Sequence, residues 1–205
     1  MSEKEQSDIE AIKGTLEEPL DVVVVGAGPA GIGVAIALMD AGIENMIVLE
    51  RNQVGSSFAK WPKETRFITP SFPSNSIGML DLNSIAIGIS PAYNMRVEHP
   101  TGQQYAKHLQ EVATYFKVPV CEETDVTEIT HVNVKSKKIL GGLLKRKQDL
   151  FRVDTNDGEI WAKHVVWAVG EYQYPRFFSF VGSPLCRHTA TVSSYKELEG
   201  DNFVI

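Results

Sequence analysis

The chain has 205 residues, of which 43% are hydrophobic and 22% are charged, so it is long enough to bury one large globular core. Its formal net charge of −6 and isoelectric point near 5.4 argue against a nucleic-acid partner. No apolar run reaches the ~18 residues of a membrane span, the acidic amino terminus is not a secretory signal, and two distant cysteines favour a reducing, cytoplasmic setting.

The first half of the chain predicts a strand–turn–helix–strand unit. Residues 1–19 are acidic with little apolar periodicity, and we expect them to form a flexible extension. Leu20–Val25 is a β-branched run typical of a strand that is buried on both faces of a parallel sheet. A glycine-rich turn, a small-residue helix over 32–41 and a second buried strand over Met46–Leu49 complete a βαβ unit.

The remaining segments predict a functional loop region, one amphipathic helix and several strands. Residues 52–100 are rich in Gly, Ser, Pro and Asn, whereas residues 101–117 have helical apolar spacing. Residues 118–120 predict a short strand, and 126–162 alternate apolar and polar residues around an Asn-Asp-Gly turn typical of a hairpin. A final apolar strand over 163–169 ends at Gly170. We therefore expect a three-layer α/β domain with a central parallel sheet, helices on one face and a small antiparallel β-meander.

The turn after the first strand carries a GxGxxG motif in the right context. Gly26 permits a tight turn, Gly28 lets a pyrophosphate approach the backbone, and Gly31 lets the helix pack closely. The helix begins at Pro29, and its amino terminus offers a favourable dipole and the free amides that follow the proline, that of Ala30 included, to the anion. Glu50 follows about 20 residues later, where it can accept both ribose hydroxyls and disfavours a 2′-phosphate. The alternative is a glycine turn that binds nothing.

Further residues decide between cofactors. Glu50-Arg51, the segment from Gly55 to Trp61 and the Ala168-Val169-Gly170 turn resemble the flavin-containing monooxygenases and the pyridine-nucleotide-disulfide-reductase-like flavoproteins. This resemblance implies a Rossmann-like fold, FAD as cofactor and NAD(P)H as the electron donor of a full-length parent. The motif and the resemblance together give these cofactor-binding positions: Gly26, Gly28, Pro29, Ala30, Gly31, Glu50, Arg51, Ser57, Phe58, Trp61, Thr69, Ser71, Val126, Ala168 and Gly170.

The sequence departs from both specialised chemistries of these families. Ala168-Val169-Gly170 lacks the family's threonine, and Phe180, Gly182 and His188 echo the monooxygenase fingerprint with too long a spacer. Disulfide reduction needs a cysteine pair, whereas Cys121 and Cys186 are each without a near neighbour in the sequence. Catalytic residues therefore stay unassigned, and the histidines show no metal-ligand spacing with the cysteines. His188 is a candidate proton shuttle or a structural residue.

The predicted function is that of the FAD-binding domain of an NAD(P)H-dependent oxidoreductase. We expect residues 20–178 to form that domain and 179–205 to be a linker and the start of an NAD(P)-binding domain that the chain lacks. The alternatives are a non-catalytic module that binds FAD or ADP-ribose and an NAD-dependent dehydrogenase. The expected partners are a small-molecule substrate or electron acceptor, with no nucleic acid, membrane or metal, and a homodimer is one assembly to consider. A basic cluster around Gly141-Gly142 predicts a solvated hairpin, and the alternative is a docking patch for an acidic partner.

Overall fold

The computed structural model describes residues 14–71, 83–139, 144–177 and 179–200. The chain divides into two compact units. The first comprises Met1–Val54 and Ala113–Val169, and the second comprises Gly55–Val112 and Gly170–Ile205. Several segments with sequence predictions lie outside the described residues, namely 1–13 of the acidic extension, 72–82 of the loop region, the tip of the basic hairpin at 140–143 and 201–205 of the expected linker and domain start.

The first unit is built on a mixed six-stranded sheet with the strand order β3-β2-β1-β6-β5-β4. Four neighbouring strands run parallel, and the last two are antiparallel to their neighbours. The strands are β1 (Leu20–Val25), β2 (Met46–Leu49), β3 (Val120–Cys121), β4 (Val126–Ile139), β5 (Leu144–Thr155) and β6 (Gly158–Trp167). The predicted parallel sheet and antiparallel meander are therefore both present, within one sheet.

Strand β6 joins these two parts of the sheet. Its first half pairs antiparallel with β5 as far as Ala162, and from Ala162 onward it pairs parallel with β1, ending opposite Val25 at Trp167. The sequence predicted a meander strand and a separate final strand over 163–169, but they form one continuous strand. Neither part contains a Gly or Pro between 159 and 167, so no local signal separates the hairpin arm from the parallel strand.

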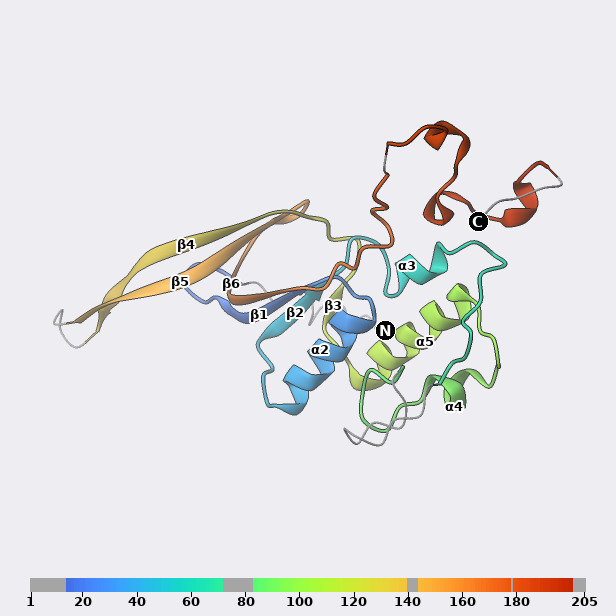
Figure 1. Ribbon diagram of the computed structural model, residues 1–205. Coiled ribbons are helices and arrows are strands. Elements are labelled where there is room, and N and C mark those ends of the chain that lie inside the picture. Colours follow the sequence, from blue (N-terminus) through green and yellow to red (C-terminus); the bar gives the residue numbers. More distant parts are fainter. Residues whose placement is uncertain (1–13, 72–82, 140–143, 178, 201–205) are drawn as a thin grey trace. The chain divides into compact units, whose positions relative to one another are not determined.

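The core of the first unit lies on both faces of β1. Val23 and Val25 pack in one cluster with Val153 of β5, and Ile129 of β4 packs against that cluster. Since side chains alternate along a strand, Val24 points to the opposite face, where helix α2 (Pro29–Asp40) contacts β1 and β2. Figure 1 shows α2 against these two strands. Helix α2 therefore packs on one face of the parallel strands, and side chains of the meander strands pack with those on the other face.

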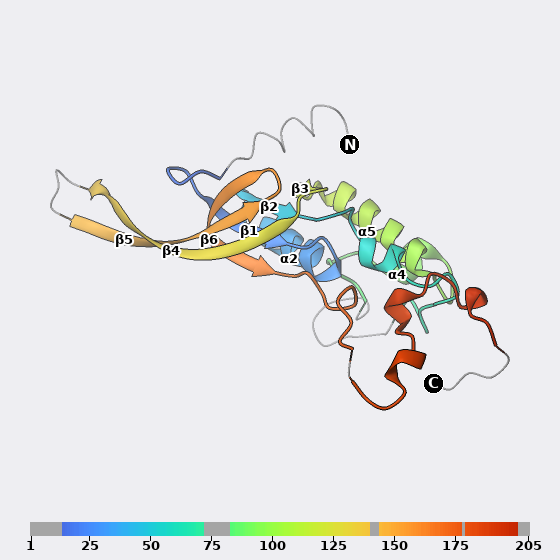
Figure 2. The same cartoon turned by 90° about the horizontal axis from the view of Figure 1, so that it is seen from above.

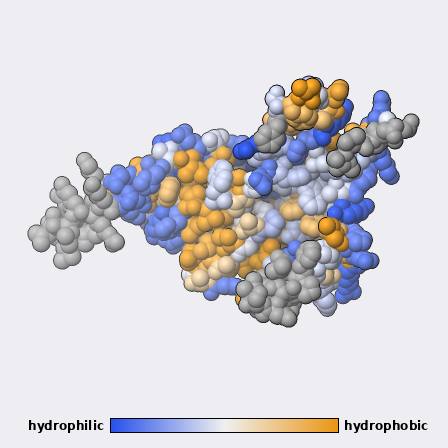
Figure 3. Space-filling model, viewed as in Figure 1, coloured by the Kyte–Doolittle hydropathy of each residue, from blue (hydrophilic) through white to orange (hydrophobic). Residues whose placement is uncertain are grey.

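Helix α2 is apolar on all sides. Its inner residues Ile32 and Ile36 are buried, yet Val34, Leu38 and Met39 on its other sides remain partly exposed. Figure 3 shows hydrophobic surface over this helix and the adjoining sheet. The helix is thus held by packing against β1 and β2 and not by an amphipathic division of its faces.

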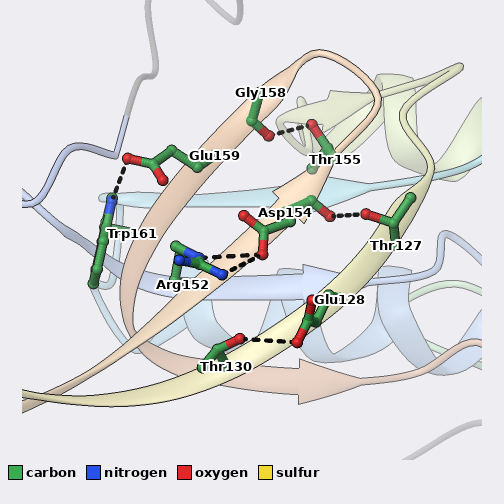
Figure 4. Close-up of polar contacts among 9 residues, drawn as sticks. All are labelled: Thr127, Glu128, Thr130, Arg152, Asp154, Thr155, Gly158, Glu159 and Trp161. Atoms are coloured by element: carbon green, nitrogen blue, oxygen red, sulfur yellow. Dashed lines mark hydrogen bonds and ion pairs between the residues drawn. The ribbon is translucent and has the colours of Figure 1, made fainter.

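The outer face of the meander is polar. The Arg152 Nε and Nη2 atoms donate to Asp154 Oδ2 at 3.1 and 3.0 Å, and the Trp161 indole donates to Glu159 Oε1 at 3.1 Å (Figure 4). The turn between β5 and β6 is closed by the Thr155 hydroxyl, which donates to the Gly158 carbonyl at 2.8 Å. Figure 2 shows β4 and β5 as a long twisted ribbon beside β6. The alternation seen in the sequence is therefore that of a half-buried sheet.

The amino-terminal segment is described from Gly14 onward. The Gly14 carbonyl accepts a hydrogen bond from the Trp161 amide at 3.0 Å, and Asp21 at the start of β1 pairs with Lys163. The end of the predicted extension is therefore attached to β6, whereas residues 1–13 lie outside the described residues.

The second unit contains most of the predicted loop region. The amphipathic helix predicted for 101–117 is confirmed as α5 (Gly102–Phe116), which begins in this unit. Two short helices that the sequence did not reveal are α3 (Ser56–Ala59) and α4 (Pro91–Met95). Three single 3-10 turns follow at Ser183–Leu185, Thr189–Thr191 and Tyr195–Glu197.

Candidate functional site

The turn between β1 and α2 is sterically closed on two sides by backbone atoms. Gly26 has a φ of +102°, and a Cβ there would lie 2.6 Å from the Ala168 carbonyl oxygen. A Cβ on Gly31 would lie 1.8 Å from the Gly26 carbonyl oxygen, so α2 packs directly on the turn. Only glycine fits at these two positions, because a backbone carbonyl oxygen lies where a Cβ atom would be.

Gly28 differs from its two neighbours in the motif. Its φ of −81° suits any residue, and a Cβ built on it would meet no atom within 4 Å. The space in front of this residue is therefore open, at the end of α2 where the first amides have no intrahelical acceptor. Pro29 occupies the first helical position, and neither Pro29 nor the exposed Ala30 places an acid in this first turn. An anion of the size of a phosphate fits this cradle in shape and charge.

Glu50 is fixed beside that cradle. Only 8% of its surface is exposed, its Oε2 accepts the Ala27 amide at 2.8 Å, and its Oε1 accepts the Asn52 amide at 3.0 Å. The backbone of Glu50 also bonds to Cys121 and Thr124 at the end of β3. The carboxylate is thus held rigidly at the carboxyl ends of three parallel strands, where open α/β sheets bind ligands. A carboxylate oxygen is an acceptor for hydroxyl donors.

The other predicted residues of the first unit have less specific surroundings. Arg51 is exposed immediately after Glu50. Val126, which opens β4, packs its side chain against the sheet core and pairs with Thr155, so only its backbone position is relevant to a ligand. The Ala168 amide donates to the Val25 carbonyl at 2.8 Å, which holds the 168–169 turn next to the glycine turn.

In the second unit, Phe58 and Trp61 belong to an aromatic cluster that the sequence only partly revealed. Phe58 lies 5.0 Å from Trp61, 4.7 Å from Tyr105 and 5.9 Å from Phe67 between ring centroids. Tyr105 is buried and its helical spacing marked it as a core residue, whereas Phe67 lies in a segment without periodicity and had no such signal. Phe58 and Trp61 are partly buried, and these ring contacts give both residues a packing role within the loop region.

The remaining predicted positions make local contacts. The Ser57 hydroxyl accepts a hydrogen bond from Gln173 Nε2 at 2.5 Å. The Thr69 hydroxyl donates to the Ser71 carbonyl at 2.9 Å and accepts from the Ser71 amide at 3.3 Å, so it closes its own loop. Gly170 has a φ of +66° with open space around its Cβ position. None of these contacts is specific for a ligand by itself.

The second unit also contains an acid, Glu64, that no sequence pattern marked. The Ser194 hydroxyl donates to Glu64 Oε1 at 2.7 Å and the Tyr195 amide donates to Glu64 Oε2 at 2.9 Å. These hydrogen bonds, assisted by the charge of Lys196, lower the pKa of Glu64 below its ordinary value of 4.5. His188 caps a 3-10 turn, since its Nδ1 accepts the Ala190 amide at 3.1 Å. This local contact gives His188 a structural role.

In the described ranges, His, Cys, Asp and Glu side chains form no group of three or more that could hold a metal ion. Within the same ranges, no helix combines the length and the apolar character that crossing a bilayer requires. Cys121 and Cys186 are both free thiols, the first partly buried and the second exposed.

The sheet order, the glycine turn and the acid after β2 define a dinucleotide-binding α/β protein. The chain belongs to the pyridine nucleotide-disulphide oxidoreductase family, which matches residues 23–205, and the family predicted from the motifs is therefore confirmed. An uncharacterized CzcO-like oxidoreductase of Geobacillus kaustophilus is 26% identical over 168 residues, which are 82% of this chain and 41% of that protein.

Solved structures show the same fold. A flavin-containing monooxygenase from Stenotrophomonas maltophilia is 18% identical with a TM-score of 0.55, over 78% of this chain and 42% of that one. The bacillithiol disulfide reductase Bdr (YpdA) from Bacillus cereus is 23% identical with a TM-score of 0.54, over 78% and 43%. A steroid monooxygenase bound to NADP is 22% identical with a TM-score of 0.51, over 79% and 28%. The chain thus spans less than half the length of these relatives.

Proposed function

We propose that this chain binds FAD through its adenosine diphosphate half and serves an NAD(P)H-dependent flavoprotein oxidoreductase. The observation that carries the proposal is the open space at Gly28, placed between the amino terminus of α2 and the fixed carboxylate of Glu50. These two features accept different parts of one ligand, a pyrophosphate and a ribose diol. One solved structure with this fold is OTEMO in complex with FAD and NADP. The OTEMO chain is 16% identical to this chain in sequence, with a TM-score of 0.50.

Each residue of the turn has a distinct part in this proposal. The free amides of the first turn of α2 donate to the pyrophosphate, and the absence of a Cβ at Gly28 allows its oxygens to approach. Glu50 accepts hydrogen bonds from the ribose hydroxyls and repels a 2′-phosphate, so the turn favours FAD over NADP. When bound, FAD supplies a ring that accepts a hydride and passes electrons onward.

The electron donor and acceptor lie beyond this turn. The sequence contains one GxGxxG motif, and we propose that NAD(P)H binds a second nucleotide-binding domain outside these 205 residues, as the family resemblance implies. An internal dithiol relay is disfavoured because Cys121 and Cys186 are widely separated in sequence and both are free thiols. The proposed acceptor is therefore a small molecule. The cysteine content supports a cytoplasmic location.

The test is the visible spectrum of the purified chain, followed by chromatography of the nucleotide that heat releases. A yellow protein that releases FAD, or becomes yellow with added FAD, supports the proposal. A protein that stays colourless in excess FAD and binds NAD overturns it in favour of a dehydrogenase. Binding of ADP-ribose and FAD with equal affinity, without electron transfer in a longer form of the protein, favours a non-catalytic module.

A glycine variant makes this test specific to the turn. Gly28→Ala places a methyl group in the open cradle, and we expect FAD affinity to fall at least about tenfold, or ~1.4 kcal/mol. Because the φ of Gly28 suits alanine, apo-protein stability should fall by only about 0.5–1 kcal/mol, the cost of a poorer helix cap. Unchanged FAD binding in this variant would place the nucleotide elsewhere.

A further inference from the structure

Asn52 lies at the carboxyl end of β2, two residues after Glu50, and its backbone is fully engaged. The Asn52 amide donates to Glu50 Oε1 at 3.0 Å, and the Asn52 carbonyl accepts the Glu123 amide at 3.0 Å. The residue is therefore held in the same network that orients the Glu50 carboxylate. Its side chain has little freedom to leave the edge of the sheet where the ligand is expected.

The side chain of Asn52 contains a donor without an acceptor. Its Nδ2 atom is buried, and no hydrogen-bond partner for it exists among the residues that the structure describes. Buried amide groups in folded proteins are nearly always hydrogen-bonded, because leaving one unpaired costs free energy. A buried donor without an acceptor, at the edge of a candidate binding site, is expected of a group that hydrogen-bonds to a ligand.

A second asparagine in the same unit shows what a structural role looks like. Asn156 Oδ1 accepts the Asp125 amide at 2.8 Å, and its Nδ2 donates to the Glu123 carbonyl at 3.1 Å. Both ends of that side chain are thus satisfied within the protein. Asn52 and Asn156 contact the same residue, Glu123, yet only Asn156 uses its side chain to do so.

We propose that Asn52 is a nucleotide-binding residue whose side-chain amide donates to an acceptor atom of the adenosine. This inference rests on the proposed function and adds to it a donor that complements Glu50. Glu50 can accept hydrogens from the ribose hydroxyls but cannot donate, so Asn52 would add a buried donor for a ribose oxygen or an adenine ring nitrogen at this edge. Asn52 and Glu50 together recognise both the donors and the acceptors of one adenosine.

The test compares Asn52→Leu with Asn156→Ala in apo stability and in binding of FAD and ADP. Leucine has a similar volume without the orphan donor, so Asn52→Leu should keep or raise the apo melting temperature while FAD and ADP affinity fall about tenfold. Asn156→Ala should lower the apo melting temperature and leave the affinity of the folded protein unchanged. Asn52→Ala serves as a second variant with no risk of a clash from leucine.

The ligand atom is distinguished with ADP and 2′-deoxy-ADP. If Asn52 donates to the ribose, its variants lose part of the wild-type preference for ADP; if it donates to the adenine ring, both ligands weaken equally. Wild-type affinity in both Asn52 variants overturns the inference, and so does a lower apo melting temperature with unchanged affinity. A wild-type protein that binds neither FAD nor ADP overturns the proposed function itself, which is a separate outcome.

Discussion

The two units of the molecule use glycine for the same steric purpose at very different distances along the chain. In the first unit, Gly26 and Gly31 belong to one short turn, and Gly31 allows α2 to touch the Gly26 carbonyl. In the second unit, Gly55 packs on the Ala106 backbone, and Gly102 packs on the Phe58 carbonyl oxygen, with 2.2 Å between that atom and a Cβ built on Gly102. The Gly31 contact is local, whereas the contacts of Gly55 and Gly102, like that of Gly26 with Ala168 in the first unit, join remote segments.

This difference determines what a sequence motif can reveal. A contact within one turn joins residues at a fixed spacing in the sequence. GxGxxG is therefore recognisable, and the steric need for its glycines can be inferred from the motif itself. A glycine that meets a residue far along the chain has no fixed spacing, and its role becomes visible only in the folded protein. The following variants test whether the two kinds of glycine contact are equally important and how the acids near them contribute.

The largest effect is expected from Gly31→Ala. The added Cβ would lie 1.8 Å from the Gly26 carbonyl oxygen, a backbone atom that cannot move without opening the turn. We expect a loss of about 4 kcal/mol in the free energy of unfolding, despite the gain of about 1 kcal/mol that alanine brings to a helix. Chemical denaturation measures it, with Gly28→Ala as the open-site control. A loss below about 1 kcal/mol would mean that α2 can shift freely.

Gly102→Ala tests the remote contact in the second unit. Its Cβ would lie 2.2 Å from the Phe58 carbonyl oxygen and 3.0 Å from the Trp61 Cβ, so the aromatic cluster must move. We expect a loss of about 2–3 kcal/mol and a weaker near-ultraviolet dichroism signal from the rings. Equal losses for Gly102→Ala and Gly31→Ala would show that a remote contact tolerates no more adjustment than a local one.

Glu50→Gln tests the acid beside the glycine turn. One of the two amides that Glu50 accepts would then face an NH₂ group, so apo stability should fall by about 1–2 kcal/mol. FAD affinity should fall about 10–100-fold because a charged acceptor for the ribose is lost. Glu122→Gln is the matched control, since Glu122 accepts the Val54 amide at 2.9 Å without carrying a proposed ligand contact. A similar affinity loss in both variants would contradict the role of Glu50.

The smallest effect is expected from Glu64→Gln in the second unit. Hydrogen bonds from Ser194 and Tyr195 lower the pKa of Glu64 from its ordinary value of 4.5. At a pH just below 4.5, the unfolded state therefore binds more protons than the folded state. The ionised Glu64 side chain therefore stabilises the folded state fully above about pH 4.5, and this stabilisation disappears as the pH falls through the lowered pKa. Melting temperatures from about pH 6 to about pH 3 should show the wild type approaching Glu64→Gln at the acid end. Glu197→Gln is the control. If the melting temperatures of the wild type and Glu64→Gln differ by the same amount at every pH in this range, the ionisation of Glu64 does not cause the difference.

Much of the first unit followed from local pattern. The β-branched run of β1, the glycine motif, the apolar run of β2 and the Asn-Asp-Gly turn each determine structure within a few residues, and all are present. The continuity of β6 did not follow, because pairing with β5 and then with β1 depends on the position of other strands. Helices α3 and α4 are too short to produce a helical period.

The candidate site divides in the same way. Gly26, Gly31 and Glu50 could be selected from the sequence because strand order and spacing bring them to one sheet edge, whereas the ligand-binding role of Glu50 stays a prediction. The orphan amide of Asn52 and the anchoring of Glu64 could not, since an asparagine or a glutamate in a loop carries no pattern in the sequence. Burial and hydrogen-bond partners, which distinguish such residues from their neighbours, are properties of the folded chain.

The sequence by itself determined the class of this protein, because a phosphate-binding turn needs glycines at fixed spacing, and an acid on the next strand is recognisable from its distance along the chain. The tertiary structure alone decided which polar groups are satisfied, which rings pack together and which glycines are sterically required. Those properties depend on contacts between segments remote in sequence, whose positions are set by packing of the whole core and not by local spacing.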